Sequence, residues 1–272
     1  MTLLELVAIL GAGVLAGTIN TIVGAGTLVT FPLLLALNIP PLVANVSNTV
    51  GLVPAAVTGA WGYRRELRGQ WSAVVRMALL SAVGGIIGAL LLLVAPADTF
   101  TVVVPWLLVL AAGLAAVQPR VTEALRRREN LAALSAGMTL TEPPPPALVD
   151  RLTRPLSAGL AVGITATGVY GGYFGAAQGV VLLALLGIAW SADLHRANGA
   201  KVVLAGMANL VSASVFAFSG KVDWRIAALI AVGSAIGGLI GAKVGRRIPA
   251  PALRVVIVVV GLAAAVALWV RG

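Results

Sequence analysis

Long apolar runs separated by short polar turns fill most of the chain. Ten apolar segments can be marked, at 3–22, 26–38, 42–61, 72–94, 100–118, 155–172, 176–189, 196–218, 225–243 and 250–270. Several approach the roughly 20 residues that a helix needs to cross the hydrocarbon core of a bilayer. The alternating segments of about ten residues that mark a membrane β-barrel are missing from the sequence. The pattern predicts an all-α polytopic membrane protein.

Composition strengthens this prediction. Of the 272 residues, 60% are apolar and 10% are charged, whereas a soluble domain has about 25% charged residues. The net charge is +10. The basic residues lie in loops beside the apolar runs, which is typical of charges that set membrane orientation and not of nucleic-acid binding. With no Cys and one His, we expect no disulfide, metal site or cofactor. Segment 3–22 has no signal-peptide pattern and is expected to be a retained span.

One polar stretch, 119–154, divides the chain. It contains Arg126–Arg128 and then Pro143–Pro146, which predicts a short amphipathic helix followed by an extended polyproline piece; a plain cytoplasmic linker is the alternative. We therefore expect a first transmembrane repeat at 1–118, the linker at 119–154 and a second repeat at 155–272.

The two halves resemble each other in sequence. SAVGGIIGA at 81–89 matches SAIGGLIGA at 234–242, an offset of 153 residues. Nearly the same offset relates Trp71 to Trp224, Asn45 to Asn198 and Gly24 to Gly175. A repeat in register at several points predicts two copies of one five-segment unit.

Loop charges indicate that the second copy is inverted. The loop at 62–70 carries three arginines, and the loop at 95–99 carries only Asp98. In the second half the loop at 219–225 is less basic, whereas Lys243, Arg246 and Arg247 follow the later segment. Equivalent loops thus exchange charge character, as inversion requires. For a protein of the cell membrane, the positive-inside rule places the linker on the cytoplasmic side and both termini outside.

A break in the backbone precedes one short segment in each half. GAGT at 24–27 precedes segment 26–38, and GAAQ at 175–178 precedes segment 176–189. These segments reach only about 20 Å at 1.5 Å per residue, so we expect helical hairpins that either cross fully or re-enter.

Matching breaks in inverted repeats predict a substrate site at the membrane midplane. The N–H groups at a helix start suit an anion, and glycines let backbone approach a ligand; tight helix packing through small residues is the alternative. The candidate substrate-binding residues are Asn20, Gly24, Ala25, Gly26, Thr27, Asn45, Asn48, Tyr170, Gly175, Gln178, Asn198 and Lys201.

Lys201 is the basic residue that lies well inside a predicted segment. It can act as counter-charge to a bound anion, or it can extend to the inner surface past His195 and Arg196. Asn45 and Asn48 share one helix face, as do Asn198 and Lys201, so their amides can bind oxyanion oxygens or hold helices together. No carboxylate lies in the middle of a segment, which argues against a cationic substrate.

The stretches GTINTIVGAGTLVTFPLLLALNIPPLVANVSNTVGLVP at 17–54 and GVYGGYFGAAQGVVLLALLG at 168–187 resemble the two signatures of the TauE/SafE family of sulfite exporters and related sulfur-anion permeases. The likeness covers nearly the whole chain outside the linker. The resemblance implies transport of sulfite, sulfonates or sulfur-containing organic acids.

The sequence thus predicts a secondary transporter of small sulfur-containing anions, taken as an exporter. A carrier or channel for another small anion, such as a carboxylate, is the alternative. The expected partners are the small anion and the lipid bilayer, with a homodimer left open and no nucleic acid. There is no Gly-rich nucleotide-binding loop, so gradients must supply the energy. No GxSxG elbow or cluster of catalytic residues indicates an enzyme.

Overall fold

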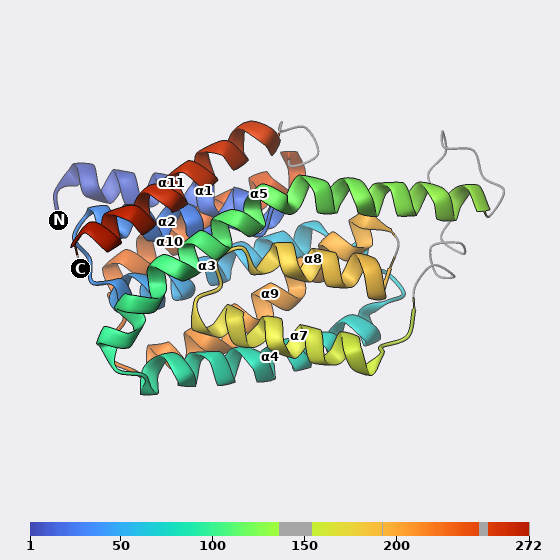
Figure 1. Ribbon diagram of the computed structural model, residues 1–272, viewed down its shortest axis with the longest axis horizontal. Coiled ribbons are helices and arrows are strands. Elements are labelled where there is room, and N and C mark those ends of the chain that lie inside the picture. Colours follow the sequence, from blue (N-terminus) through green and yellow to red (C-terminus); the bar gives the residue numbers. More distant parts are fainter. Residues whose placement is uncertain (136–153, 192, 245–249, 272) are drawn as a thin grey trace.

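The computed structural model describes residues 1–135, 154–191, 193–244 and 250–271, and in these ranges it is helical without a β-sheet (Figure 1). The helices are α1 Leu3–Ile22, α2 Thr27–Ala36, α3 Pro41–Gly62, α4 Trp71–Val94, α5 Ala97–Ser135, α7 Ala158–Tyr173, α8 Gln178–Ala189, α9 Leu194–Ala217, α10 Trp224–Val244 and α11 Ala250–Arg271. Each expected segment corresponds to one helix, so the all-α prediction is confirmed.

Length separates the helices into two groups. Within the described ranges, six helices are long and apolar enough to cross a membrane: α1, α3, α4, α5, α9 and α10. Helices α2 and α8 have 10 and 12 residues, about 15 and 18 Å at 1.5 Å per residue. Since the hydrocarbon core is about 30 Å thick, neither short helix spans it alone.

Helix α5 differs from the expectation, because it has 39 residues and continues past Pro119 to Ser135. The short helix expected in the linker is therefore the end of α5. Tertiary contacts hold it: Leu125 is buried against Gly187 of α8, and the Arg128 guanidinium donates to the Ile188 carbonyl over 2.7 Å. The polyproline piece predicted around Pro143–Pro146 lies outside the described residues.

The repeated glycine motif makes the closest helix contacts. On α1, Gly17 lies against the backbone of Ser234 on α10, and the Thr18 hydroxyl donates to the Gly237 carbonyl over 3.1 Å. In the same way Gly84 on α4 lies against the backbone around Gly168 on α7. Each motif therefore packs along the first helix of the other half, where small residues allow backbones to approach.

The equivalent helices α3 and α9 pack against each other near the centre and run antiparallel. Gly59 lies against Val202, and three residues earlier on α3 Ala56 lies against Gly206, which is further along α9. Both termini lie at one end of the bundle, and the end of α5 and the start of α7 lie at the other (Figure 1). This is the packing that an inverted repeat requires; inversion across a membrane stays a prediction.

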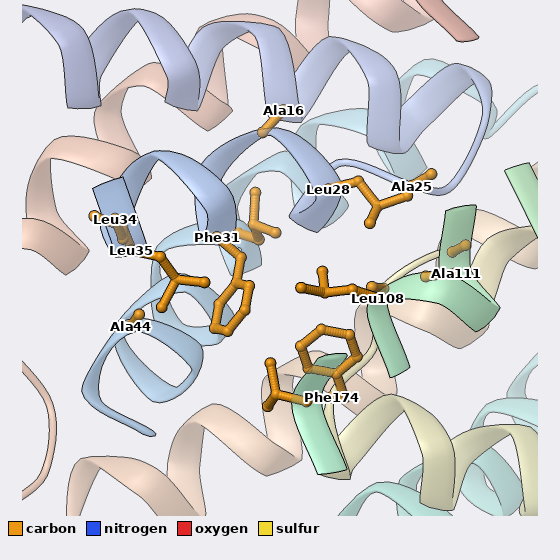
Figure 2. Close-up of a cluster of buried hydrophobic side chains, with 14 of the residues drawn as sticks. Ala16, Ala25, Leu28, Phe31, Leu34, Leu35, Ala44, Leu108, Ala111 and Phe174 are labelled. Carbon is orange, nitrogen blue, oxygen red and sulfur yellow. The ribbon is translucent and has the colours of Figure 1, made fainter. Parts of the chain in front are cut away.

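Apolar side chains fill the space around the breaks in two clusters. One contains Phe31 of α2 and Phe174 from the second break, whose rings meet edge to face at 5.3 Å with Leu108 of α5 beside them (Figure 2). The other surrounds Trp190 and Met77 nearer the start of α7. The two breaks thus lie inside a packed bundle.

Candidate functional site

The two breaks touch each other through backbone. Gly24 and Gly175 have φ of +83° and +75°, values that favour glycine because an L side chain is strained there. The Gly179 N–H donates to the Gly24 carbonyl over 3.2 Å. A Cβ added to Gly24 would lie 2.5 Å from the Gly179 Cα. Residues more than 150 positions apart therefore meet where both helices are interrupted.

Asn48 ties the first break to α3. Its amide nitrogen donates to the Thr27 hydroxyl over 3.3 Å, and its amide oxygen accepts a bond from the Thr30 hydroxyl. Both threonines lie in the first turn of α2, and Gly26 before them provides no side-chain cap. Thr30 is not among the site residues predicted from the sequence. It lies three residues after Thr27, which places both on one helix face.

Two side chains of its own half contact the second break. The Gln178 amide nitrogen donates to the Thr167 carbonyl over 3.2 Å, and the Tyr170 hydroxyl donates to the Ala176 carbonyl. Gln178 is buried at the first position of α8. The Gln178 N–H donates to the Gly175 carbonyl over 3.3 Å. The Gly179 N–H donates to the Gly24 carbonyl, so the first two N–H groups of α8 both donate to backbone carbonyls of the protein.

Donor side chains form hydrogen bonds with the last backbone carbonyls of α1 and α7, the helices that end at the two breaks. The Lys201 ammonium of α9 donates to the carbonyls of Thr21 and Ile22 at the end of α1, both over 3.3 Å. The Asn45 amide of α3 donates to the Tyr173 carbonyl at the end of α7 over 3.0 Å. These carbonyls have no partner within their own helix and carry partial negative charge, so each break is stabilised from the opposite half.

Lys201 is 1% exposed, so it does not reach the surface in this structure. No carboxylate in the described part of the chain forms an ion pair with it; its recorded partners are the two carbonyls. Its charge is thus balanced by dipoles alone. Beside the second break the Asn45 amide oxygen is buried and has no hydrogen-bond partner among the described residues.

The remaining predicted site residues divide into two groups. Asn20 is half-buried, with its Cβ against Gly26, and Ala25 is buried in the apolar cluster, so both lie at the first break. Asn198, however, donates to the Tyr63 hydroxyl over 2.7 Å at the end of α3. It therefore contacts the loop after α3 and not a break, although its sequence equivalent Asn45 does contact one.

The family model described as sulfite exporter TauE/SafE matches residues 9–268. The chain belongs to the TauE/SafE family. Two curated relatives are similar along most of their length. A "Probable membrane transporter protein ORF9" of Sinorhizobium sp is 25% identical over 260 residues, covering 94% of this chain and 89% of the relative. A "Probable membrane transporter protein" of Haemophilus influenzae is 26% identical over 243 residues, covering 86% and 82%. No solved structure matches.

Membership explains why the chain is helical and apolar, because TauE/SafE proteins are membrane transporters and not a class of enzymes. The match includes both breaks and every candidate residue. The chemical groups that these residues offer are an ammonium and several amides and hydroxyls. They favour a small polar ligand with acceptor atoms.

Proposed function

We propose that this TauE/SafE protein is a secondary transporter that exports a small sulfur-containing anion, such as sulfite, a sulfonate or an organosulfur acid, across the cytoplasmic membrane. The observation that carries the proposal is Lys201. Its ammonium is buried at the first break, against the carbonyls of Thr21 and Ile22 at the end of α1. A buried positive charge of this kind favours an anionic ligand.

The energetics favour an anion. Burying an ammonium costs several kcal/mol that dipoles offset only in part, and an opposite charge offsets much more. A bound anion would in turn lose its hydration, which Lys201 and nearby donors such as Asn48 and Thr27 would replace. Ionisable groups inside membrane proteins mark substrate pathways for this reason.

The positions of the acidic residues also support an anionic substrate. The described carboxylates lie at helix starts, in the turn after α3 and on the extension of α5; they are Glu5, Glu66, Asp98, Glu123, Glu129, Asp193 and Asp223. None lies in the middle of a described helix of the bundle. A cation carrier normally needs a buried carboxylate, so a cationic substrate is disfavoured.

Motion would come from the two halves. Each half contributes one break and also a donor that holds the other half's broken helix, namely Lys201 or Asn45. Rocking of one half against the other would expose the site to each side in turn. With the linker inside and both termini outside, the bases cluster on the cytoplasmic side. A carrier for a carboxylate, or an anion channel, would use the positive charge of Lys201 in the same way.

A binding and transport experiment tests the proposal. Purified protein is screened by thermal shift against sulfite, thiosulfate, sulfoacetate and taurine, with acetate and choline as comparators. We expect a sulfur anion to stabilise the protein most and choline not at all. Proteoliposomes loaded with that anion should then show saturable uptake and counterflow. Stabilisation by acetate alone would support the carboxylate carrier, and flux without saturation or counterflow would support a channel.

A further inference from the structure

A polar cavity lies where α4 and α7 begin. Figure 1 shows the start of α7 at the end of the bundle opposite the two termini. The cavity has a volume of about 550 Å³, within the range of small-molecule sites. It is lined by Gln70, Ser72 and Arg76 at the start of α4, by Arg154 and Leu156 before α7, and by Trp190 after α8. The transport site does not include any of these residues.

The cavity is positively charged. It contains two guanidinium groups, and none of the residues that line it is acidic. Arg76 is held on the first turns of α4, where its Nε donates to the Ser72 carbonyl over 3.3 Å. The Arg154 backbone N–H donates to the Trp190 carbonyl over 2.6 Å, which holds the main chain of the second arginine at the cavity. Two guanidiniums at one cavity match a phosphate or carboxylate better than a single cation would.

The start of α4 adds to the positive electrostatic potential of the cavity. Gln70 precedes the helix, and its side chain does not cap the first N–H groups of α4. Such groups carry partial positive charge. This feature strengthens the attraction for an anion that the two arginines already provide.

The surroundings of the cavity indicate which anion fits. Leu156 lines the cavity and is 37% exposed. Trp71 and Val75 on α4 are next in sequence to the lining residues Ser72 and Arg76, and they are 41% and 51% exposed. Exposed apolar side chains beside a basic pocket are expected where the side of a helical bundle meets lipid, and Trp is enriched at the membrane interface. A ligand that carries both a phosphate and acyl chains would satisfy the arginines and these side chains together.

We propose that this cavity binds the phosphodiester headgroup of an anionic phospholipid in the leaflet on the linker side. The guanidiniums of Arg76 and Arg154 contact the phosphate, and the acyl chains run along the exposed faces of α4 and α7. Basic pockets between membrane helices bind such headgroups. The proposal is independent of which substrate the protein transports.

Native mass spectrometry of the purified protein tests it. The detergent-solubilised protein is incubated with phosphatidylglycerol or with phosphatidylcholine, and bound lipid is counted. We compare Arg76→Gln/Arg154→Gln with Arg65→Gln/Arg68→Gln, which removes two charges from the neighbouring loop outside the cavity. Wild type and the loop variant should retain phosphatidylglycerol over phosphatidylcholine. The cavity variant should bind phosphatidylglycerol more weakly than wild type, by a factor of about ten or more.

Two outcomes would overturn the proposal. One is equal retention of phosphatidylglycerol by the cavity variant and wild type. The other is displacement by millimolar inorganic phosphate without any lipid preference, which would assign the cavity to a soluble anion. If the glutamine variant does not fold, Arg76→Lys/Arg154→Lys keeps the charge but loses the bidentate geometry. Intermediate retention would support the site, and unchanged retention would oppose it.

Discussion

The backbone N–H of Gly179 donates to the carbonyl of Gly24 over 3.2 Å, so the two broken hairpins are joined without any side chain. This close approach depends on the absence of a Cβ at both positions. The breaks therefore form one structural unit at the centre of the protein, and changes at either one should affect both.

Gly24→Ala should destabilise the protein and impair transport. The new Cβ would lie 2.5 Å from the Gly179 Cα, at a φ of +83°. Strain and overpacking together should cost about 2 kcal/mol or more. The control is Gly69→Ala, which has a φ of +78° and no heavy atom within 4 Å of the added Cβ; it should cost about 1 kcal/mol. Thermal unfolding midpoints in detergent measure both, and equal shifts would remove the contact from the explanation.

Lys201→Ala should abolish or strongly weaken anion binding, because it removes the buried charge at the first break. Lys201→Arg should retain part of the affinity, since charge survives but geometry changes. Lys221→Ala removes an equal charge from the loop before α10 and should bind normally. Isothermal titration gives the affinities. An alanine variant within about twofold of wild type, roughly 0.4 kcal/mol, would leave Lys201 with only its structural contact to α1.

Asn48→Asp should weaken anion binding more than Asn198→Asp does. The first substitution puts a carboxylate against the start of α2, where Asn48 contacts Thr27 and Thr30, and a like charge near a bound anion costs about 1 kcal/mol or more. The second puts it beside the Tyr63 hydroxyl, at the end of α3. Equal losses in titration would mean that Asn198 also contacts the anion.

Orientation can be tested by single-cysteine labelling, because the chain has no Cys. Leu131→Cys on the extension of α5 and Phe218→Cys after α9 are suitable, since these positions are 67% and 93% exposed. A membrane-impermeant maleimide on intact cells should label position 218, and position 131 should react only after the membrane is opened. Labelling of both from the same side would contradict inverted halves.

Much of the fold follows from local pattern. Apolar length alone gives helix bounds such as 3–22, and the glycines at 24 and 175 indicate the breaks because only a residue without Cβ adopts their backbone easily. The end of α5 was not predicted correctly. A proline and three arginines look like a linker, and the contacts that stabilise a helix there, Leu125 with Gly187 and Arg128 with the Ile188 carbonyl, are made with a distant part of the chain.

The site could be predicted only in part. Sequence identifies Lys201 as unusual, because it is a base in an apolar helix. Its partners, the carbonyls of Thr21 and Ile22, lie about 180 positions earlier, and no side-chain pattern reveals a backbone acceptor. The repeat suggests equal roles for Asn45 and Asn198, but the two halves place different groups opposite them, Tyr173 and Tyr63.

The packing of α1 along α10 also has a consequence for biosynthesis. Gly17 contacts Ser234, so α1 leaves the ribosome before the partner residue, which is 217 residues further along the chain. At about 5–20 residues per second this takes roughly ten seconds or more. During that interval the glycine face of α1 is uncovered in the membrane, and helices already inserted, or a chaperone, must tolerate or shield it.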